Sequence, residues 1–289
     1  MAANTQQDLL HRTLKQLPVK ILRDTWDIKG QSQDDLINGL IASNKEDALF
    51  SFFFDNFNYT KQHIYIYQLD HAFNLPKFNQ KNFPYVLEQA KIIPGGIEFF
   101  CLPLVTYTGT LISPYEKKQI QFYQPLKITL ENDLIIFQFT ILEKNLSAYL
   151  PASRLVKTHR DLDEDYFRQE INNYISSQYI IEICDLNKGV KHLLRNNVIG
   201  LRFVKYKKSK STTTETMDED NTFREAYPGD FDKMMKEPLM KALMQYLTKD
   251  DKFPHLFTVD SSLGQLGFST YPQNVNQINN VTTTILSKN

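Results

Sequence analysis

The chain of 289 residues contains only two cysteines, and it has no long apolar run. Cys101 and Cys184 stand far apart, which favours reduced, buried thiols over a disulfide framework. A membrane-spanning helix needs a run of about 18 or more apolar residues, and none occurs. The first ten residues lack the basic segment and apolar core of a secretory signal. We therefore expect a cytoplasmic or nuclear protein with no membrane contact and no secretion.

An excess of charge of one sign is also missing, because 33 lysines and arginines balance 33 aspartates and glutamates. Any contact with nucleic acid must then come from a local patch and not from bulk charge. Neither a Walker loop nor a dinucleotide fingerprint occurs among the ten glycines. The six histidines show no metal-ligand spacing. The sequence therefore indicates no metal site and no cofactor.

One tetrapeptide matches a catalytic motif in letters only. His159-Arg160-Asp161-Leu162 has the form of the protein-kinase catalytic loop, but Tyr166 stands where that loop needs a magnesium-binding Asn. The carboxylates at 163–165 fit the acidic first turn of a helix. Asp70-His71 is a dyad without a candidate nucleophile, and we expect it to serve a turn. The sequence thus predicts no catalytic residues and favours a protein that is not an enzyme.

Two later carboxylates keep a catalytic alternative open. Glu182 lies in an apolar, strand-like segment and Asp185 follows it, with Lys188 and Lys191 close behind. Metal-dependent nucleases use acidic residues at strand ends together with a lysine to bind magnesium and activate water. The alternative function is therefore a nuclease, or an accessory subunit of a bacterial defence system.

Hydrophobic periodicity divides the chain into a helical first part and a mixed second part. Residues 1–60 are predicted to form a small helical domain, with an aromatic helix over 45–57. Residues 61–289 are predicted to form a mixed domain with an antiparallel β-meander and C-terminal helix–strand units of βαβ type. The predicted strands are 63–69, 97–106, 119–130, 134–142, 179–184, 198–206, 257–260 and 265–270, and the predicted helices are 84–92, 163–177, 186–195, 231–247 and 275–286. The predicted fold class is α+β.

A basic run at the end of the strand 198–206 is the first candidate nucleic-acid contact. It consists of Arg202, Lys205, Lys207, Lys208 and Lys210. Strand alternation places Lys205 and Lys207 on one face, where they can neutralise phosphates, although a solvated strand end fits equally well. The Thr-rich and then acidic segment 209–221 shows no apolar periodicity. We expect it to be a flexible loop that screens the basic run.

The N-terminal helical pair is the second candidate. Pro18 can open its first helix and Gly30 can end it. Ser32 and Asp35 predict a capping box at the start of the second helix. Basic residues are expected on or beside the outer face of this pair, namely Arg12, Lys15, Lys20, Arg23 and Lys29. A small basic helical pair of this kind fits a nucleic-acid reader.

The same pair resembles the SAP motif, a helix-extended-helix module that binds DNA. The resemblance is carried by Leu17, Ile21, Leu22, Arg23, Gly30, Asp35, Leu36, Ile37 and Leu40. It covers about a tenth of the chain. The motif normally has a Lys in the turn after the Gly, whereas this chain has residues 31–33, Gln-Ser-Gln. The resemblance implies binding of duplex DNA by this segment, without that lysine.

A second resemblance is to the centromere protein N family of kinetochore adaptors. It is carried by residues 8–18, Trp26-Asp27, Ala48-Leu49, Phe57 and the strand end 67–69. The segment between these blocks is shorter than in that family, and Gln16 stands where a Lys is expected. The resemblance implies a pyrin-like helical domain and an adaptor that contacts chromatin.

The leading hypothesis from the sequence is a non-catalytic DNA-binding or chromatin-binding adaptor that uses the basic N-terminal helices. DNA and a second protein are the expected partners. Two alternatives stay open, namely the nuclease or defence accessory subunit, and a protein-interaction subunit with no nucleic-acid contact.

Overall fold

The computed structural model describes residues 5–25, 30–112, 115–143, 146–150, 154–207, 211–217, 221–248 and 250–289. The fold is α+β, as predicted, because N-terminal helices precede a region rich in antiparallel strands. Within these ranges no helix has the length and apolar character needed to cross a membrane. Cys101 and Cys184 are buried free thiols, in agreement with the expectation from their spacing.

Four helices open the chain. They are α1 (Gln6–Leu14), α2 (Val19–Thr25), α3 (Gln33–Ser43) and α4 (Glu46–Asp55). The predicted capping box of α3 is present: the Ser32 hydroxyl accepts from the Asp35 backbone N–H, and the Ser32 N–H donates to Asp35 Oδ2 at 3.0 Å. Leucines of α1–α3 and phenylalanines of α4 bury one core, which the strand residue Phe100 completes. Phe100 stacks on Phe54 with 4.5 Å between ring centroids, so the helices are anchored on the sheet.

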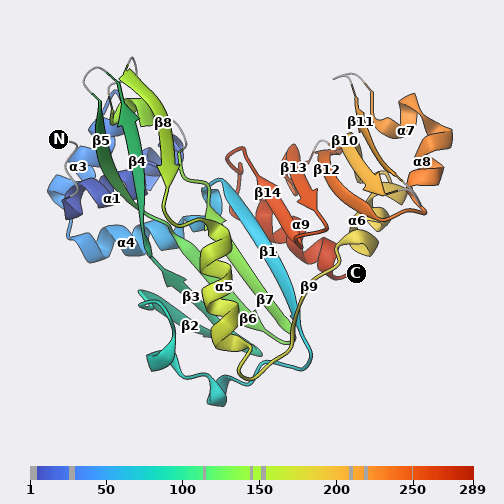
Figure 1. Cartoon of the computed structure of the whole chain (residues 1–289), viewed down its shortest axis with the longest axis horizontal. Helices are drawn as coiled ribbons and strands as arrows, with labels where there is room; N and C mark the ends of the chain where they lie inside the picture. The colour runs from blue at the N-terminus through green and yellow to red at the C-terminus, as the bar shows by residue number, and fades with distance from the viewer. Residues whose placement is uncertain are drawn as a thin grey trace.

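One large antiparallel sheet forms the body of the molecule (Figure 1). Its strands, in spatial order, are β11 (Thr212–Thr216), β10 (Ile199–Lys207), β12 (Leu239–Tyr246), β13 (Leu256–Asp260), β14 (Gln265–Phe268), β1 (Gln62–Leu69), β7 (Leu134–Thr140), β6 (Leu126–Glu131), β3 (Gly96–Cys101) and β2 (Gln89–Ile93), while β9 (Ile181–Ile183) also pairs with β1. A small second sheet has the order β5 (Glu116–Tyr123), β4 (Leu104–Leu111), β8 (Leu155–Arg160). Short 3₁₀ turns lie at 57–59, 75–77, 80–82 and 146–148.

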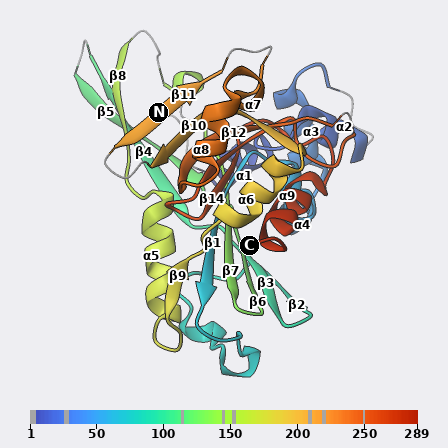
Figure 2. The same ribbon diagram turned by 90° about the vertical axis from the view of Figure 1, so that its right-hand side faces the viewer.

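The central strand β1 takes part in two separate cores. Tyr65 and Tyr67 belong to the core under α5 (Glu164–Ile175). Ile64 and Ile66 belong to the core under α6 (Asn187–Arg195) and α9 (Gln277–Leu286). Because successive strand residues point to opposite faces, the two halves of the sheet are covered on opposite sides. Figure 1 shows α5 on the β7 side of β1, and Figure 2 shows α6 beside α9.

Two prolines divide strands that the periodicity predicted as continuous. The predicted strand 97–106 is β3 and β4, and the predicted strand 119–130 is β5 and β6. Pro103 and Pro125 stand at the two breaks, and the Gln124 N–H donates to the Pro103 carbonyl at 2.8 Å. Proline cannot donate to a strand ladder, so the chain leaves the large sheet and returns to it at these points.

Three other predictions of local structure were wrong. The segment predicted as a helix over 231–247 is instead the short helix α8 (Pro228–Met234), which follows α7 (Phe223–Ala226), and then strand β12. No helix forms over 84–92, where the edge strand β2 begins at Gln89. The predicted loop 209–221 contains β11, which pairs with β10. Residues 209–210 and 218–220 of this segment lie outside the described ranges. No pairing among the described strands is parallel, so the predicted βαβ units are also wrong.

The remaining elements lie where the periodicity placed them. Helices α5, α6 and α9, strand β10 and the hairpin of β13 and β14 all fall within a few residues of their predicted bounds. Asp163 caps α5 by accepting from the Tyr166 N–H at 2.9 Å, in agreement with an acidic first turn. The turn between β6 and β7 holds Asn132 at φ 52°.

Candidate nucleic-acid interface

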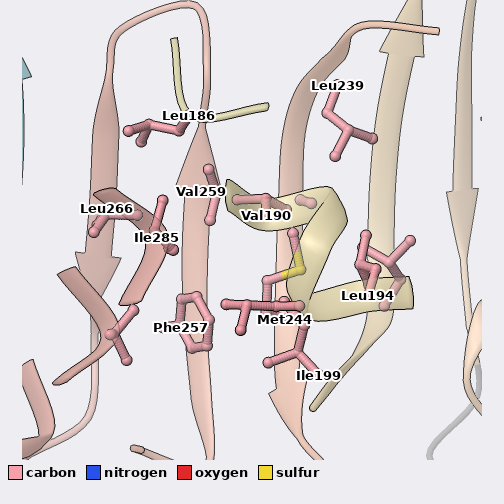
Figure 3. Close-up of a cluster of buried hydrophobic side chains, with 14 of the residues drawn as sticks. Leu186, Val190, Leu194, Ile199, Leu239, Met244, Phe257, Val259, Leu266 and Ile285 are labelled. Carbon is pink, nitrogen blue, oxygen red and sulfur yellow. The ribbon is translucent and has the colours of Figure 1, made fainter. Parts of the chain in front are cut away.

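Helix α6 divides sharply into an apolar and a basic side. Figure 3 shows Val190 and Leu194 among side chains of the sheet such as Met244 and Val259. Lys188, Lys191 and Arg195 follow the spacing i, i+3, i+7, so they share the opposite, outer side. Burial of the apolar residues therefore fixes three cations in one outward stripe.

Helix α9 passes close to α6 because of Gly189. A Cβ atom on Gly189 would lie 2.1 Å from the carbonyl oxygen of Ile285 in α9, so only glycine permits this approach. The Gly189 N–H donates to Asn289 Oδ1 at 3.2 Å, which places the residues after α9 at the start of α6. The close crossing brings Lys288 to the same surface as the stripe on α6.

A groove of about 520 Å³ lies on this surface, which we call the α6 groove. It is lined by Asp185, Asn187, Lys188, Lys191, His192, Arg195, Met235, Lys236, Pro238 and Lys288. Five of these side chains are always cationic at neutral pH and one is a carboxylate. Within the described ranges, none of the five cations lies in ion-pair distance of a carboxylate. The groove is thus a concentration of unneutralised positive charge on a chain of zero formal charge.

The acidic and amide groups at the groove hold the backbone. Asp185 Oδ1 accepts from the Asn187 N–H at 2.9 Å, and Asn187 Oδ1 accepts from the Leu239 N–H at 2.7 Å. Lys191 Nζ donates to the Glu237 carbonyl at 2.8 Å. Burial lowers the pKa of Lys191, and the neighbouring charge of Arg195 lowers that pKa further. Lys191 therefore fixes the groove wall, while the exposed cations are available to a ligand.

The predicted basic run on β10 ends beside this groove. The Lys207 N–H donates to the carbonyl of Pro238, a groove residue, at 3.1 Å. Lys205 lies opposite Lys241 on β12, and both alternate with residues that are buried under α6, so these two lysines lie on the other face of the sheet. Arg202 instead donates to Gln245 Oε1 and to the Asn221 carbonyl. Lys208 and Lys210 lie outside the described residues.

Arg12 is a buried structural residue, which corrects its predicted place on an outer basic face. Its side chain is 6% exposed. The guanidinium donates to the Gln121 carbonyl at 2.6 Å and lies 5.4 Å from the ring centroids of both Phe122 and Tyr149. Lys15, which was predicted to flank the helical pair, forms an ion pair with Asp34 at 2.9 Å.

The two exposed cations of α2 belong to a segment in which acidic residues outnumber basic ones. Lys20 and Arg23 are exposed, and Lys29 lies outside the described residues. Residues 1–60 contain six lysines and arginines against eight aspartates and glutamates. Figure 1 places the N-terminal helices at one end of the long axis, and α6–α8 lie toward the other end. The two predicted basic patches therefore do not form one surface.

The carboxylates considered for a nuclease are not assembled. Among the residues that the structure describes, no group of three His, Cys, Asp or Glu side chains could hold a metal ion. Glu182 is exposed on β9 opposite Gln68, while Asp185 supports α6. Asp161, from the kinase-like tetrapeptide, accepts from the Thr106 N–H at 2.8 Å. Asp70 Oδ1 contacts His71 Nδ1 at 2.9 Å and accepts from the Ile180 N–H, as expected for a turn.

The sequence held a partial signal for the α6 groove. The i, i+3, i+7 spacing of Lys188, Lys191 and Arg195 is visible in the chain, although the nuclease hypothesis from the sequence involves only Lys188 and Lys191. Lys236 and Lys288 lie on other segments, and only the folded chain brings them to α6. No family model and no curated protein matches the chain.

Proposed function

We propose that the protein is a non-catalytic DNA-binding adaptor, and that the α6 groove holds the phosphate backbone. The observation that carries this proposal is the meeting of five cations from three segments in one groove with a single carboxylate. Lysine and arginine side chains neutralise phosphates and release counterions, which is the main source of sequence-independent affinity for DNA.

The roles within the groove follow from exposure. Lys188, Arg195 and Lys236 are exposed and reach the ligand. Lys207, at the end of β10, alternates with the buried Tyr206, so its side chain lies on the opposite face of the sheet and takes no part in this contact. Contacts of this kind position a protein on the duplex without reading bases. We therefore expect little sequence preference from the groove alone.

The N-terminal pair is the competing DNA-binding surface, and it is supported by its resemblance to the SAP motif. Its exposed cations, Lys20 and Arg23, belong to the N-terminal helices, which lie toward the opposite end of the long axis from α6. The separation makes the two surfaces testable one at a time.

Duplex-DNA binding against salt concentration tests the proposal. We expect steep loss of affinity with salt. The variant Lys188→Ala/Arg195→Ala/Lys236→Ala should reduce the slope of log affinity against log salt by about three, roughly one for each lost phosphate contact. The matched variant Lys20→Ala/Arg23→Ala should keep the slope and affinity of the natural chain.

Two results would overturn this assignment. If only the Lys20→Ala/Arg23→Ala variant loses affinity, the N-terminal pair is the DNA-binding surface. If the natural chain does not bind at low salt, the protein-interaction subunit is favoured, and co-purification of a partner free of nucleic acid tests it. Cleavage of DNA or RNA with magnesium or manganese that vanishes in Glu182→Gln would instead support the nuclease.

A further inference from the structure

The C-terminal half of the large sheet carries its helices on one face only. Residues of α6, α7, α8 and α9 share a single core with the buried residues of β10, β12 and β13. Figure 1 shows α6, α7 and α8 on the same side of these strands. Because strand residues alternate between faces, the residues between the buried positions point away from the helices. Phe203 and Leu243 are large apolar residues of this second face, and neither belongs to a core cluster of the described chain.

The strand register arranges the residues of this second face in rows. Lys205 on β10 lies opposite Lys241 on β12, and Phe203 lies opposite Leu243. The edge strand β11 contributes three exposed threonines, which pair with Phe203, Lys205 and Lys207. We call this surface the lysine face, and it consists of Phe203, Lys205, Lys207, Thr212, Thr214, Thr216, Lys241 and Leu243.

The lysine face holds positive charge that no described carboxylate neutralises. Lys205 and Lys241 are cross-strand neighbours, and like charges directly opposite each other destabilise a sheet. Within the described residues, neither of them nor Lys207 lies in ion-pair distance of a carboxylate. Asp260 lies opposite Lys241 in the register, but its Oδ1 accepts from the Ser262 N–H at 3.2 Å and so holds the turn after β13. A bound polyanion would relieve this repulsion between facing lysines.

Phe203 places an aromatic ring beside these cations. It precedes Lys205 by two strand residues, a separation of about 6.6 Å at the ordinary rise of a strand. The residue is half-exposed, and its ring has no aromatic or cationic partner among the described residues. Aromatic rings that alternate with basic residues bind unpaired strands, because bases stack on the rings and phosphates meet the cations. In a duplex the faces of the bases are hidden, so a ring on a sheet reaches them only in a single strand.

We propose that the lysine face binds single-stranded nucleic acid. A base stacks on Phe203, and the neighbouring phosphates lie against Lys205, Lys207 and Lys241. The threonine hydroxyls of β11 donate to the same backbone, as hydroxyl side chains commonly do to phosphates. The surface and the ligand both differ from those of the α6 groove, so this proposal does not rest on the duplex binding proposed there.

Fluorescence anisotropy of the full chain with labelled oligothymidylate and oligouridylate tests the proposal. We expect both unpaired strands to bind at low salt, and the tighter of the two identifies DNA or RNA as the preferred ligand. Polyglutamate is the probe for negative charge without bases. We expect it to compete about tenfold more weakly than the oligonucleotides, because it offers no base to the ring.

The variant Phe203→Leu isolates the stacking contact. It should weaken single-strand binding about tenfold, because one stacked base is lost. Duplex binding should stay as in the natural chain. Tyr227→Leu is the matched control, because it removes a 51% exposed aromatic ring from the junction of α7 and α8. This control should bind single strands with the affinity of the natural chain.

The variant Lys205→Gln/Lys241→Gln isolates the charge. It should reduce the slope of log affinity against log salt for single strands by about 1.4, roughly 0.7 for each lost phosphate contact. Its melting temperature should stay equal or rise, because the substitution removes a like-charge pair. The variant Lys188→Ala/Arg195→Ala/Lys236→Ala should keep the single-strand slope of the natural chain.

Failure of both oligonucleotides to bind at low salt would overturn the proposal. So would natural single-strand affinity in Phe203→Leu, or competition by polyglutamate as strong as that of an oligonucleotide. If Phe203→Leu did not fold, an unchanged salt slope in Lys205→Gln/Lys241→Gln would overturn it instead. Absence of duplex binding with single-strand binding retained would refute only the α6 groove, so the two proposals fail separately.

Discussion

Helices α2 and α6 both present cations to solvent, and a comparison of their surroundings separates them. On α2, Lys20 and Arg23 stand in a segment where acidic residues outnumber basic ones. On α6, Lys188 and Arg195 are joined by Lys236 from another segment, with Asp185 as the single carboxylate of the groove. Attraction of a polyanion depends on the summed field, so an exposed cation counts for little when nearby carboxylates offset it.

The comparison also shows that a cation's position in sequence does not define its role. Arg12 was grouped with Lys20 and Arg23 by its place before the helical pair, yet it lies between two aromatic rings. Lys191 shares a stripe with Lys188, yet its ammonium group is held by the Glu237 carbonyl. A long basic side chain acts as a packing element wherever its stem and head both find partners.

Loss of the Arg12 side chain should have the largest effect on stability. Arg12→Ala removes a charged hydrogen bond to the Gln121 carbonyl and the cation–π contacts with Phe122 and Tyr149. We expect a loss of about 3 kcal/mol in the free energy of unfolding. Urea denaturation measures it. DNA affinity of the folded variant should be unchanged, and a selective loss of DNA affinity would return Arg12 to the binding surface.

A methyl group on Gly189 should disturb the α6 groove directly. Gly189→Ala places a Cβ against the backbone of Ile285, and neither backbone can yield without moving a helix. We expect a loss of about 2 kcal/mol in stability, typical of overpacking, together with weaker DNA binding as Lys288 moves from α6. Gly229→Ala is the matched control, because a Cβ there has open space. Equal stability of both variants would contradict the tight crossing of α6 and α9.

His11, in the N-terminal helix α1, should make the stability of the protein depend on pH near neutrality. Burial lowers the pKa of His11 below its ordinary value of 6.5, and the weaker attraction of Asp34 opposes this change. The unfolded chain therefore takes up the proton first, so stability is full above about pH 6.5 and declines below it. The melting temperature of the natural chain should fall between about pH 7 and pH 5.5 more than that of His11→Gln. Parallel curves for the two proteins would exclude this role of His11.

The smallest predicted effect is on the alkylation rates of the two thiols. Cys101 lies in the core under α5 and Cys184 in the core under α6 and α9, so each thiol reports on one half of the sheet. Burial raises the pKa of Cys101 and of Cys184, so neither should be alkylated quickly in the native protein. Cys184 lies beside the end segment that contacts α6, with Asn289 Nδ2 at 3.5 Å from its sulfur. Gly189→Ala should therefore speed iodoacetamide labelling of Cys184 and leave Cys101 unchanged, as followed by mass spectrometry. Equal rates at both sites would indicate global unfolding instead.

The sequence predicted those elements whose local pattern agrees with their tertiary setting. Helix α3 has its capping box, and α6 has one apolar and one basic side. Strand β12 was missed because its residues Leu239–Tyr246, rich in Leu, Met, Lys and Ala, favour helix by local propensity. Pairing with β10 and β13 on both sides overrides that propensity. Strand β11 was missed because its threonines form an edge that buries little apolar surface.

The site was less predictable than the fold for a physical reason. A groove formed by α6, Lys236 and Lys288 depends on contacts between segments separated by tens of residues, and no periodicity encodes them. For the strand breaks, by contrast, the sequence carries a local signal, because Pro103 and Pro125 interrupt the strand ladder at the two points where the chain leaves and rejoins the large sheet.

The place of β1 in the sheet has a consequence for how the chain folds. Its neighbour β7 is made early, whereas its other neighbour β14 lies so late that the Tyr65–Gln265 hydrogen bond joins residues 200 positions apart. During synthesis the first half of β1, Gln62–Tyr65, must therefore wait with one edge unpaired until almost all of the described chain has left the ribosome, while Tyr67–Leu69 can pair earlier with β9. Contacts of such high sequence separation slow folding, so the last step of sheet closure should set the rate at which the native protein appears.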